Sequence, residues 1–146
     1  MKPVHLAKRA LTSLWNGPVG QSGLETARSV LNDGEMELWA SMQPRDQRHS
    51  LVVLRRFGAL VPAASRAERA AALLHDVGKV PSNLGWTARI LATIVGPRGR
   101  RFGSYARHES VGAAMLASVS EERTVELVAM RVDDAVSRAL ASADDV

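Results

Sequence analysis

Apolar residues recur at helical spacing along most of this chain, and short runs of Gly, Pro, Asn or Asp separate the repeats. Strict alternation of apolar and polar residues, which would predict half-buried strands, does not occur. In the first part of the chain the pattern predicts helices at residues 4–15, 23–31, 35–42 and 44–61. The Asn-Asp-Gly sequence at residues 32–34 predicts a turn. Pro44 suits the first position of a helix, where its missing N–H costs nothing.

The second half of the chain continues the same pattern. It predicts helices at residues 67–74 and 84–95, then one opened by His108, one following Ser120, and a last one that runs into the C-terminal residues. Ser120 is a good N-cap for the helix that follows it, and Asp133 or Asp134 can cap the last helix. We therefore predict an all-α fold: a single domain of about seven or eight helices, with residues 1–44 as an N-terminal helical extension and residues 45–146 as the core.

A polar pair follows the helix predicted at residues 67–74. Ser65 and Glu68 form a capping box at its start, and Gly78 is expected to end it in the left-handed conformation, which places His75-Asp76 in the last turn. A carboxylate there faces the negative end of the helix dipole. A bound divalent cation would offset the unfavourable interaction between this carboxylate and the helix dipole. Imidazole and carboxylate groups are both ordinary metal ligands. Alternatively, the pair arises by chance and the histidine only interacts with the helix dipole.

Composition narrows the class of protein. A chain of 146 residues with 46% hydrophobic and 23% charged residues fits a globular domain with a proper core. The absence of Cys excludes disulfides, thiolate metal sites and cysteine nucleophiles. No apolar stretch predicts a membrane span or a secretory signal, so we expect a cytoplasmic protein. The net charge of +4 suits anionic small molecules or nucleic acid.

Two further residues lie near the ends of predicted helices. His49 lies on the apolar stripe of residues 44–61, and Asp144 follows a helix rich in Leu and Ala. Taken singly, His49 is typical of a hydrogen-bonded core histidine and Asp144 of a solvated terminal residue. Helices that each direct a His or Asp inward near one end can nevertheless converge on a single cation.

The order of these residues resembles the HD domain superfamily of metal-dependent phosphohydrolases. Its pattern is a His on one helix, a His-Asp pair on a second and an Asp on a late helix, matched here at residues 48–51, 73–79 and 140–144. The resemblance covers roughly residues 45–146. It implies an HD-type helical bundle that binds one divalent metal ion and hydrolyses phosphate esters. The metal ligands that it implies are His49, His75, Asp76 and Asp144.

The same resemblance implies roles in catalysis and substrate binding. Asp76 would ligate the metal with one oxygen and orient the attacking water with the other, because a bound cation turns water into a nucleophile. In the branch with a His-Asp-x-Gly-Lys motif, which includes cyclic-dinucleotide phosphodiesterases, a His opening a helix supplies another ligand. His108 fits that place, but it can equally contact substrate phosphate or simply cap its helix. Residues 130–132 are Met-Arg-Val where two-metal members carry a His-His pair, and the Gly-Tyr-Pro signature is absent.

Other basic residues are candidates for phosphate binding. Lys79 can steady a phosphate oxygen as a point charge, or else it interacts with its helix dipole. Residues 96–107 form a loop rich in Gly and Arg, in which Arg101 and Arg107 can engage phosphate bidentately. The loop can also be a solvated flexible segment.

We therefore expect a metal-dependent phosphohydrolase, a phosphatase or phosphodiesterase, that acts on a small nucleotide-like phosphomonoester or diester. The expected metal is one divalent ion of Mn, Fe, Mg, Zn, Co or Ni, and the sequence leaves open whether a second ion binds. The alternative is a catalytically reduced HD-type module that signals or binds a partner. Nucleic-acid binding would rest on charge alone, since no helix-turn-helix pattern occurs, and it is not expected. Membrane association is not expected either, and the oligomeric state stays open.

Overall fold

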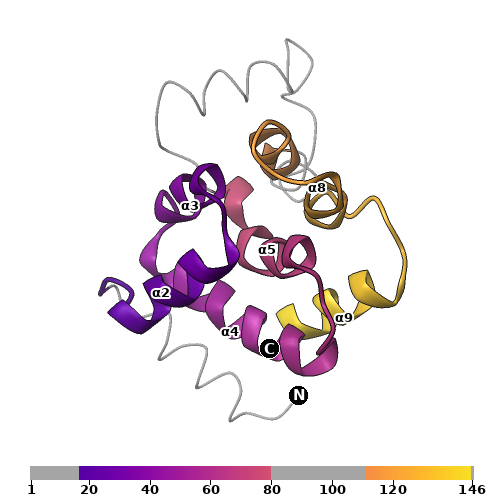
Figure 1. Cartoon of the computed structure of the whole chain (residues 1–146), viewed down its shortest axis with the longest axis horizontal. Helices are drawn as coiled ribbons and strands as arrows, with labels where there is room; N and C mark the ends of the chain where they lie inside the picture. The colour runs from indigo at the N-terminus through magenta and orange to yellow at the C-terminus, as the bar shows by residue number, and fades with distance from the viewer. Residues whose placement is uncertain (1–16, 80–110, 146) are drawn as a thin grey trace.

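The computed structural model describes residues 17–79 and 111–145 of the chain. Every regular element in these ranges is a helix, which confirms the predicted all-α class (Figure 1). The elements with complete bounds are α2 (Gln21–Val30), α3 (Asp33–Ala40), α4 (Pro44–Leu60), α5 (Arg66–Leu74), the 3-10 helix η1 (Val77–Lys79), α8 (Glu122–Val128) and α9 (Ala135–Asp144). Residues 111–116 are also helical. Among the described helices, none is both long and apolar enough to cross a bilayer.

Helix α5 lies at the centre of the bundle, where it contacts α2, α3, α4 and α8 (Figure 1). A run of small residues followed by Leu73 and Leu74 makes this possible, because the whole run from residue 70 to residue 74 is fully buried. Ser65 and Glu68 form the predicted capping box at its start. The helix that carries the central motif is therefore held on several sides by the core.

Helix α4 begins at Pro44 as predicted, with the proline at the start of its first turn. Its buried face differs from the stripe that helical spacing predicts, which consists of His49, Val52, Val53, Arg56, Phe57 and Leu60. Val53 and Phe57 are buried, but Leu60 is 54% exposed and Arg56 is exposed. The stripe is rotated because α4 also directs polar side chains inward: the buried Ser50 hydroxyl accepts a hydrogen bond of 2.9 Å from the Trp39 indole of α3.

The turn predicted at residues 32–34 is wrong. Asn32 is the N-cap of α3, and its side chain accepts a hydrogen bond from the backbone N–H of Glu35 at 2.8 Å. The Glu35 carboxylate in turn accepts from the Asn32 N–H at 3.0 Å, which completes a capping box. Helix α3 therefore begins directly after Asn32, without an intervening turn.

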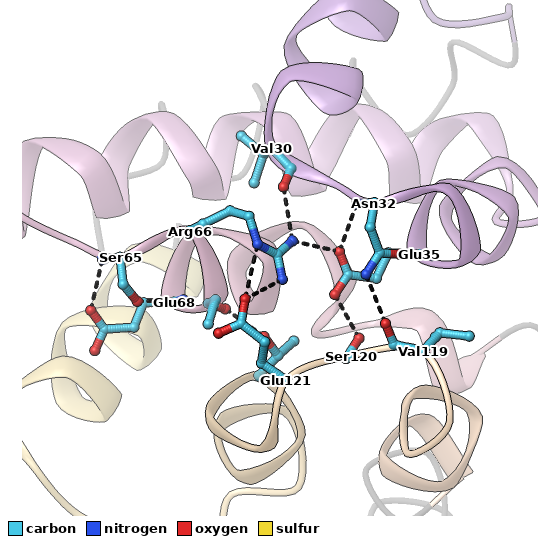
Figure 2. A network of polar contacts seen from close by, with 11 residues as sticks. Val30, Asn32, Glu35, Ser65, Arg66, Glu68, Val119, Ser120 and Glu121 are labelled. Carbon is cyan, nitrogen blue, oxygen red and sulfur yellow. Dashed lines mark hydrogen bonds and ion pairs between the residues drawn. The ribbon is translucent and has the colours of Figure 1, made fainter.

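Glu35 is the buried, charged centre of a polar network (Figure 2). Its side chain is fully buried, and Arg66 at the start of α5 donates to it at 2.8 Å. The same guanidinium bonds Glu121 at 2.6 Å and the Val30 carbonyl at 3.0 Å. Because the capping box of α3, the first residue of α5 and the N-cap of α8 share one ion network, these three helices are fixed relative to one another.

Ser120 was expected to cap α8, and this prediction is wrong by one residue. The N-cap is Glu121, which makes no side-chain capping bond. The Ser120 hydroxyl instead donates to the Glu35 carboxylate at 2.8 Å (Figure 2). A buried carboxylate is a stronger acceptor than the alternatives open to this hydroxyl, so tertiary contact overrides the local capping pattern.

Helix α9 closes the bundle against α4. Asp134 caps it, as predicted for one of the two aspartates, and accepts from the Ser137 N–H at 2.8 Å. Arg123 of α8 reaches Asp134 at 2.8 Å and Glu68 of α5 at 3.1 Å. The packing of α9 along α4 brings Asp144, the last residue of α9, into contact with His49 of α4.

Three of the predicted elements lie outside the described residues. They are the helix at residues 4–15, the helix at residues 84–95 and the loop at residues 96–107.

Candidate metal centre

The His75-Asp76 pair lies immediately after α5, rather than in its last turn. Helix α5 ends at Leu74, and His75 is its C-cap. The 3-10 helix η1 follows, and the Lys79 N–H donates to the Asp76 carbonyl at 2.9 Å. Gly78 lies inside η1, so the prediction that it terminates the helix as a left-handed residue is wrong. The tight turn places the two functional side chains next to each other, with His75 Nε2 3.4 Å from Asp76 Oδ2.

The backbone of α5 orients the His75 ring. Its Nδ1 lies 2.8 Å from the Ala72 carbonyl oxygen, which only accepts hydrogen bonds, so Nδ1 carries a proton and donates. Nε2 faces the opposite way, 3.1 Å from Asp144 Oδ1 and 3.4 Å from Asp76 Oδ2. This is the arrangement of metal-binding histidines, in which a backbone carbonyl fixes one nitrogen and leaves the other free for the ion.

His49 and Asp144 reach the same point from α4 and α9. Asp144 Oδ1 accepts a hydrogen bond from His49 Nε2 at 2.8 Å, so a single carboxylate oxygen contacts both histidines. The centroids of the His49 and His75 rings are 5.6 Å apart. The structure therefore brings together four side chains that are separated by as many as 95 positions in the sequence.

The donor atoms fit a divalent cation. One nitrogen or oxygen from each of His49, His75 and Asp76 lies within 4.8 Å of the others. Ligand atoms about 2.1 Å from one ion lie roughly 3.0–3.5 Å apart at octahedral or tetrahedral angles, which is close to the Asp144 and Asp76 distances given above. Imidazole nitrogen with carboxylate oxygen suits manganese, iron, zinc, cobalt and nickel, and carboxylate oxygen also suits magnesium.

The surroundings of His75 favour its protonated form. Burial by itself lowers the pKa of His75, but hydrogen bonds to Asp144 and Asp76 and the charges of these carboxylates outweigh it and raise the pKa to about 10. Burial raises the pKa of Asp76, yet the His75 and Lys79 contacts hold it well below its usual range. Hydrogen bonds from His49 and His75 do the same to the pKa of Asp144.

Lys79, which the sequence suggested as a phosphate contact, lies next to the cluster. Its ammonium group lies 3.0 Å from Asp76 Oδ1, while the side chain stays 48% exposed. With His75, Lys79 offsets the carboxylate that sits at the negative end of α5. The other predicted substrate-binding residues, Arg101, Arg107 and His108, lie outside the described residues.

The helix at residues 111–116 passes close to the motif at Gly112. A Cβ atom on Gly112 would lie 3.2 Å from Val128 Cγ1 and 3.4 Å from the backbone nitrogen of Gly78. Glycine therefore allows this helix to pack against the His-Asp turn and against α8. The reason for a glycine four residues after His108 is close packing.

A cavity of about 450 Å³ opens beside the cluster. His75, Asp76 and Asp144 line one end, and residues of the α8–α9 connection and α9 line the rest. Met130 is among them, and sequence reasoning assigned it no role. It has a φ of 55°, and it is 67% exposed. No sequence signal marks a methionine for the left-handed conformation.

A helical bundle with two histidines and two aspartates converging from α4, α5 and α9 defines an all-α protein with a site suited to a divalent cation. The HD domain family model matches residues 47–143, so the chain belongs to the HD domain family. The match includes His49, His75 and Asp76 and ends one residue before Asp144. Searches of curated proteins and of solved structures give no significant match.

Proposed function

We propose that this protein is a metal-dependent phosphohydrolase that cleaves a small nucleotide-like phosphomonoester or phosphodiester with water. The observation that carries the proposal is the shared position of Asp144 Oδ1 between the Nε2 atoms of His49 and His75, next to Asp76. In the proposal these four side chains hold one divalent ion. Membership of the HD domain family supports this, because the family is one of metal-dependent phosphohydrolases.

The ion, when bound, acidifies a coordinated water and polarises a phosphoryl oxygen. The two oxygens of Asp76 are already in different surroundings: Oδ2 faces His75 at 3.4 Å and Oδ1 faces Lys79 at 3.0 Å. Asp76 is therefore assigned two tasks, with Oδ2 as ligand and Oδ1 as acceptor of the proton of the attacking water. Because its pKa is lowered, the Asp76 carboxylate stays ionised at neutral pH, as a metal ligand must be.

Substrate phosphate is assigned to the exposed side of the cluster. Lys79 has the reach and the exposure to leave Asp76 and bind a phosphate oxygen. Arg101, Arg107 and His108 are proposed as further phosphate contacts on sequence grounds. The substrate is a small molecule in the cytoplasm, and neither a membrane nor nucleic acid is part of the proposal.

Metal content and turnover test this proposal together. Purified protein is analysed for bound metals, then screened against phosphomonoesters and diesters with each divalent ion. We expect about one ion per chain and turnover that Asp76→Asn reduces at least 100-fold. Asp144→Asn should lose most metal affinity, while Asp145→Asn, a matched loss of charge at the next, exposed position, should keep it.

The alternative function is a binding module that has lost catalysis. The Met-Arg-Val sequence at residues 130–132 favours it, since two-metal relatives carry histidines there. Stoichiometric metal without turnover on any phosphate ester would establish the module and exclude the hydrolase. Full metal occupancy in His75→Ala would exclude the proposed ligand set itself.

A further inference from the structure

The cavity beside the metal cluster has one polar end and one apolar wall. His75, Asp76 and Asp144 form the polar end. The wall comes from Leu127, Val128, Met130, Val132, Leu140 and Ala141. At about 450 Å³ the cavity falls within the size range of small-molecule sites, so it holds more than a phosphate group alone.

The two charged residues near the apolar wall neutralise each other. Asp133 and Arg138, which also line the cavity, form an ion pair of 3.1 Å with each other. A neutral, apolar part of a ligand therefore meets no uncompensated charge on this side. The cationic group that can contact a phosphate is Lys79, which lies 3.0 Å from Asp76 beside the metal cluster.

Met130 occupies a position that ordinarily selects glycine. Helix α8 ends in a Schellman motif, in which the Arg131 N–H donates to Glu126 O at 3.0 Å and the Met130 N–H to Leu127 O at 3.2 Å. Residue 130 is the left-handed residue of this motif, with a φ of 55°. A side chain there is strained, and this one is a large apolar side chain that is 67% exposed. Stability alone explains neither the strain nor the exposure.

We propose that Met130 and the apolar wall bind an aromatic ring carried by the phosphate ester. The proposal rests on the proposed function, because it places the phosphate at the metal end of the same cavity. Thioether sulfur makes favourable contacts with aromatic rings, and the flexible methionine side chain adapts to a ring entering from solvent. The left-handed backbone of Met130 directs that side chain to the cavity, and the strain lowers the stability of the C-terminal end of α8.

Two phosphonates test this without requiring catalysis. Phenylphosphonate carries an aromatic ring and methylphosphonate does not, and their C–P bonds are not cleaved by phosphate ester hydrolysis. Calorimetric titration of the metal-loaded full chain should show phenylphosphonate binding about tenfold tighter. In Met130→Gly this preference should fall below about threefold, while methylphosphonate affinity stays the same.

Thermal unfolding provides a second measurement on the same variant. Met130→Gly should raise the melting temperature by roughly 2–4 °C, because glycine relieves the left-handed strain. Loss of ring binding in a more stable protein cannot be attributed to misfolding. Leu60→Ala is the matched control: it also removes an exposed large apolar side chain, from α4, and should leave the phosphonate preference unchanged.

Three results would overturn the proposed site for an aromatic ring at Met130, called the ring site below. They are equal affinity for the two phosphonates, a preference for phenylphosphonate that survives Met130→Gly, and no binding of either phosphonate. These outcomes are distinct from failure of the proposed function. A preference that depends on Met130, without turnover of any phosphate ester under any metal, supports the ring site and excludes the hydrolase.

Discussion

The first prediction concerns the proton that the metal-free cluster holds on His75. The contacts with Asp144 and Asp76 raise the pKa of His75 to about 10. A metal ion bound to Nε2 must displace this proton, because a protonated imidazole cannot be a ligand. We therefore expect each ion that binds near neutral pH to release about one proton from His75.

The size of the effect follows from the pKa. At pH 7.5 a group with a pKa of about 10 is almost fully protonated, whereas an ordinary histidine with a pKa of about 6.5 carries only about 0.1 proton. The gap of about 2.5 pH units corresponds to about 3 kcal/mol, since one unit is about 1.4 kcal/mol. Proton competition should weaken metal binding at pH 7.5 by roughly 300-fold, and affinity should rise about tenfold per pH unit above it.

Calorimetry in two buffers measures the proton directly. Mn²⁺ is titrated into metal-free protein at pH 7.5 in buffers that differ in ionisation enthalpy, and the slope of observed enthalpy against buffer enthalpy gives the protons released. Manganese is preferred to zinc, which lowers the pKa of its bound water to about 7 in proteins and would add a second proton. We expect a slope of about one.

A slope near 0.1 would refute the reasoning, because His75 would then behave as an isolated histidine. The matched pair for this experiment is Asp144→Asn and Asp145→Asn. The first removes a carboxylate that raises the pKa of His75, so it should release fewer protons and bind the ion more weakly. The second removes an exposed charge and should match the natural protein.

Three further predictions concern stability. The pKa of His75 in the folded protein lies above its unfolded value of about 6.5. Protonated His75 therefore stabilises the fold fully below pH 6.5, and this contribution is lost as the pH rises toward about 10. The melting temperature of protein treated with a chelator to remove metal should fall across that window. A flat profile would contradict this. Glu35→Ala should cost about 3 kcal/mol in denaturant unfolding, since the fully buried carboxylate accepts three hydrogen bonds, while the exposed control Glu37→Ala should stay within about 0.5 kcal/mol. Equal losses would be evidence against the network. Ser65→Ala should cost about 1 kcal/mol by removing the N-cap of α5, and Ser142→Ala, on the exposed face of α9, almost nothing. A loss in the second variant as large as in the first would argue against capping as the cause.

Features set by nearby residues were predictable. The Ser65–Glu68 capping box and the first-turn position of Pro44 involve partners within one helical turn, so the sequence carries them directly. Asn32 and Glu35 have the same three-residue spacing, and the pattern was available there too. The Asn-Asp-Gly sequence is also typical of a turn, and from the sequence we interpreted these residues as a turn alone.

Features set by distant residues were not predictable from local pattern. Ser120 caps no helix because its hydroxyl donates to Glu35, which lies 85 positions earlier. The order of His49, His75-Asp76 and Asp144 indicated a common site, but only the packing of α9 on α4 places one Asp144 oxygen between two imidazoles. The 3-10 turn after α5 likewise depends on its surroundings, since Gly78 packs against the helix that contains Gly112.

The charges of the cluster connect metal binding to substrate binding. Without metal, the carboxylates of Asp76 and Asp144 are balanced by protonated His75 and by Lys79, so these four groups carry no net charge. When a divalent ion replaces the His75 proton, the same groups and the ion together carry a net charge of about +1. The site then attracts a phosphate anion, and Lys79, no longer the main counter-charge of Asp76, is free to bind it. A metal-free protein should therefore bind phosphonates poorly even though its fold is intact, because the proton neutralises the site that the metal makes positive.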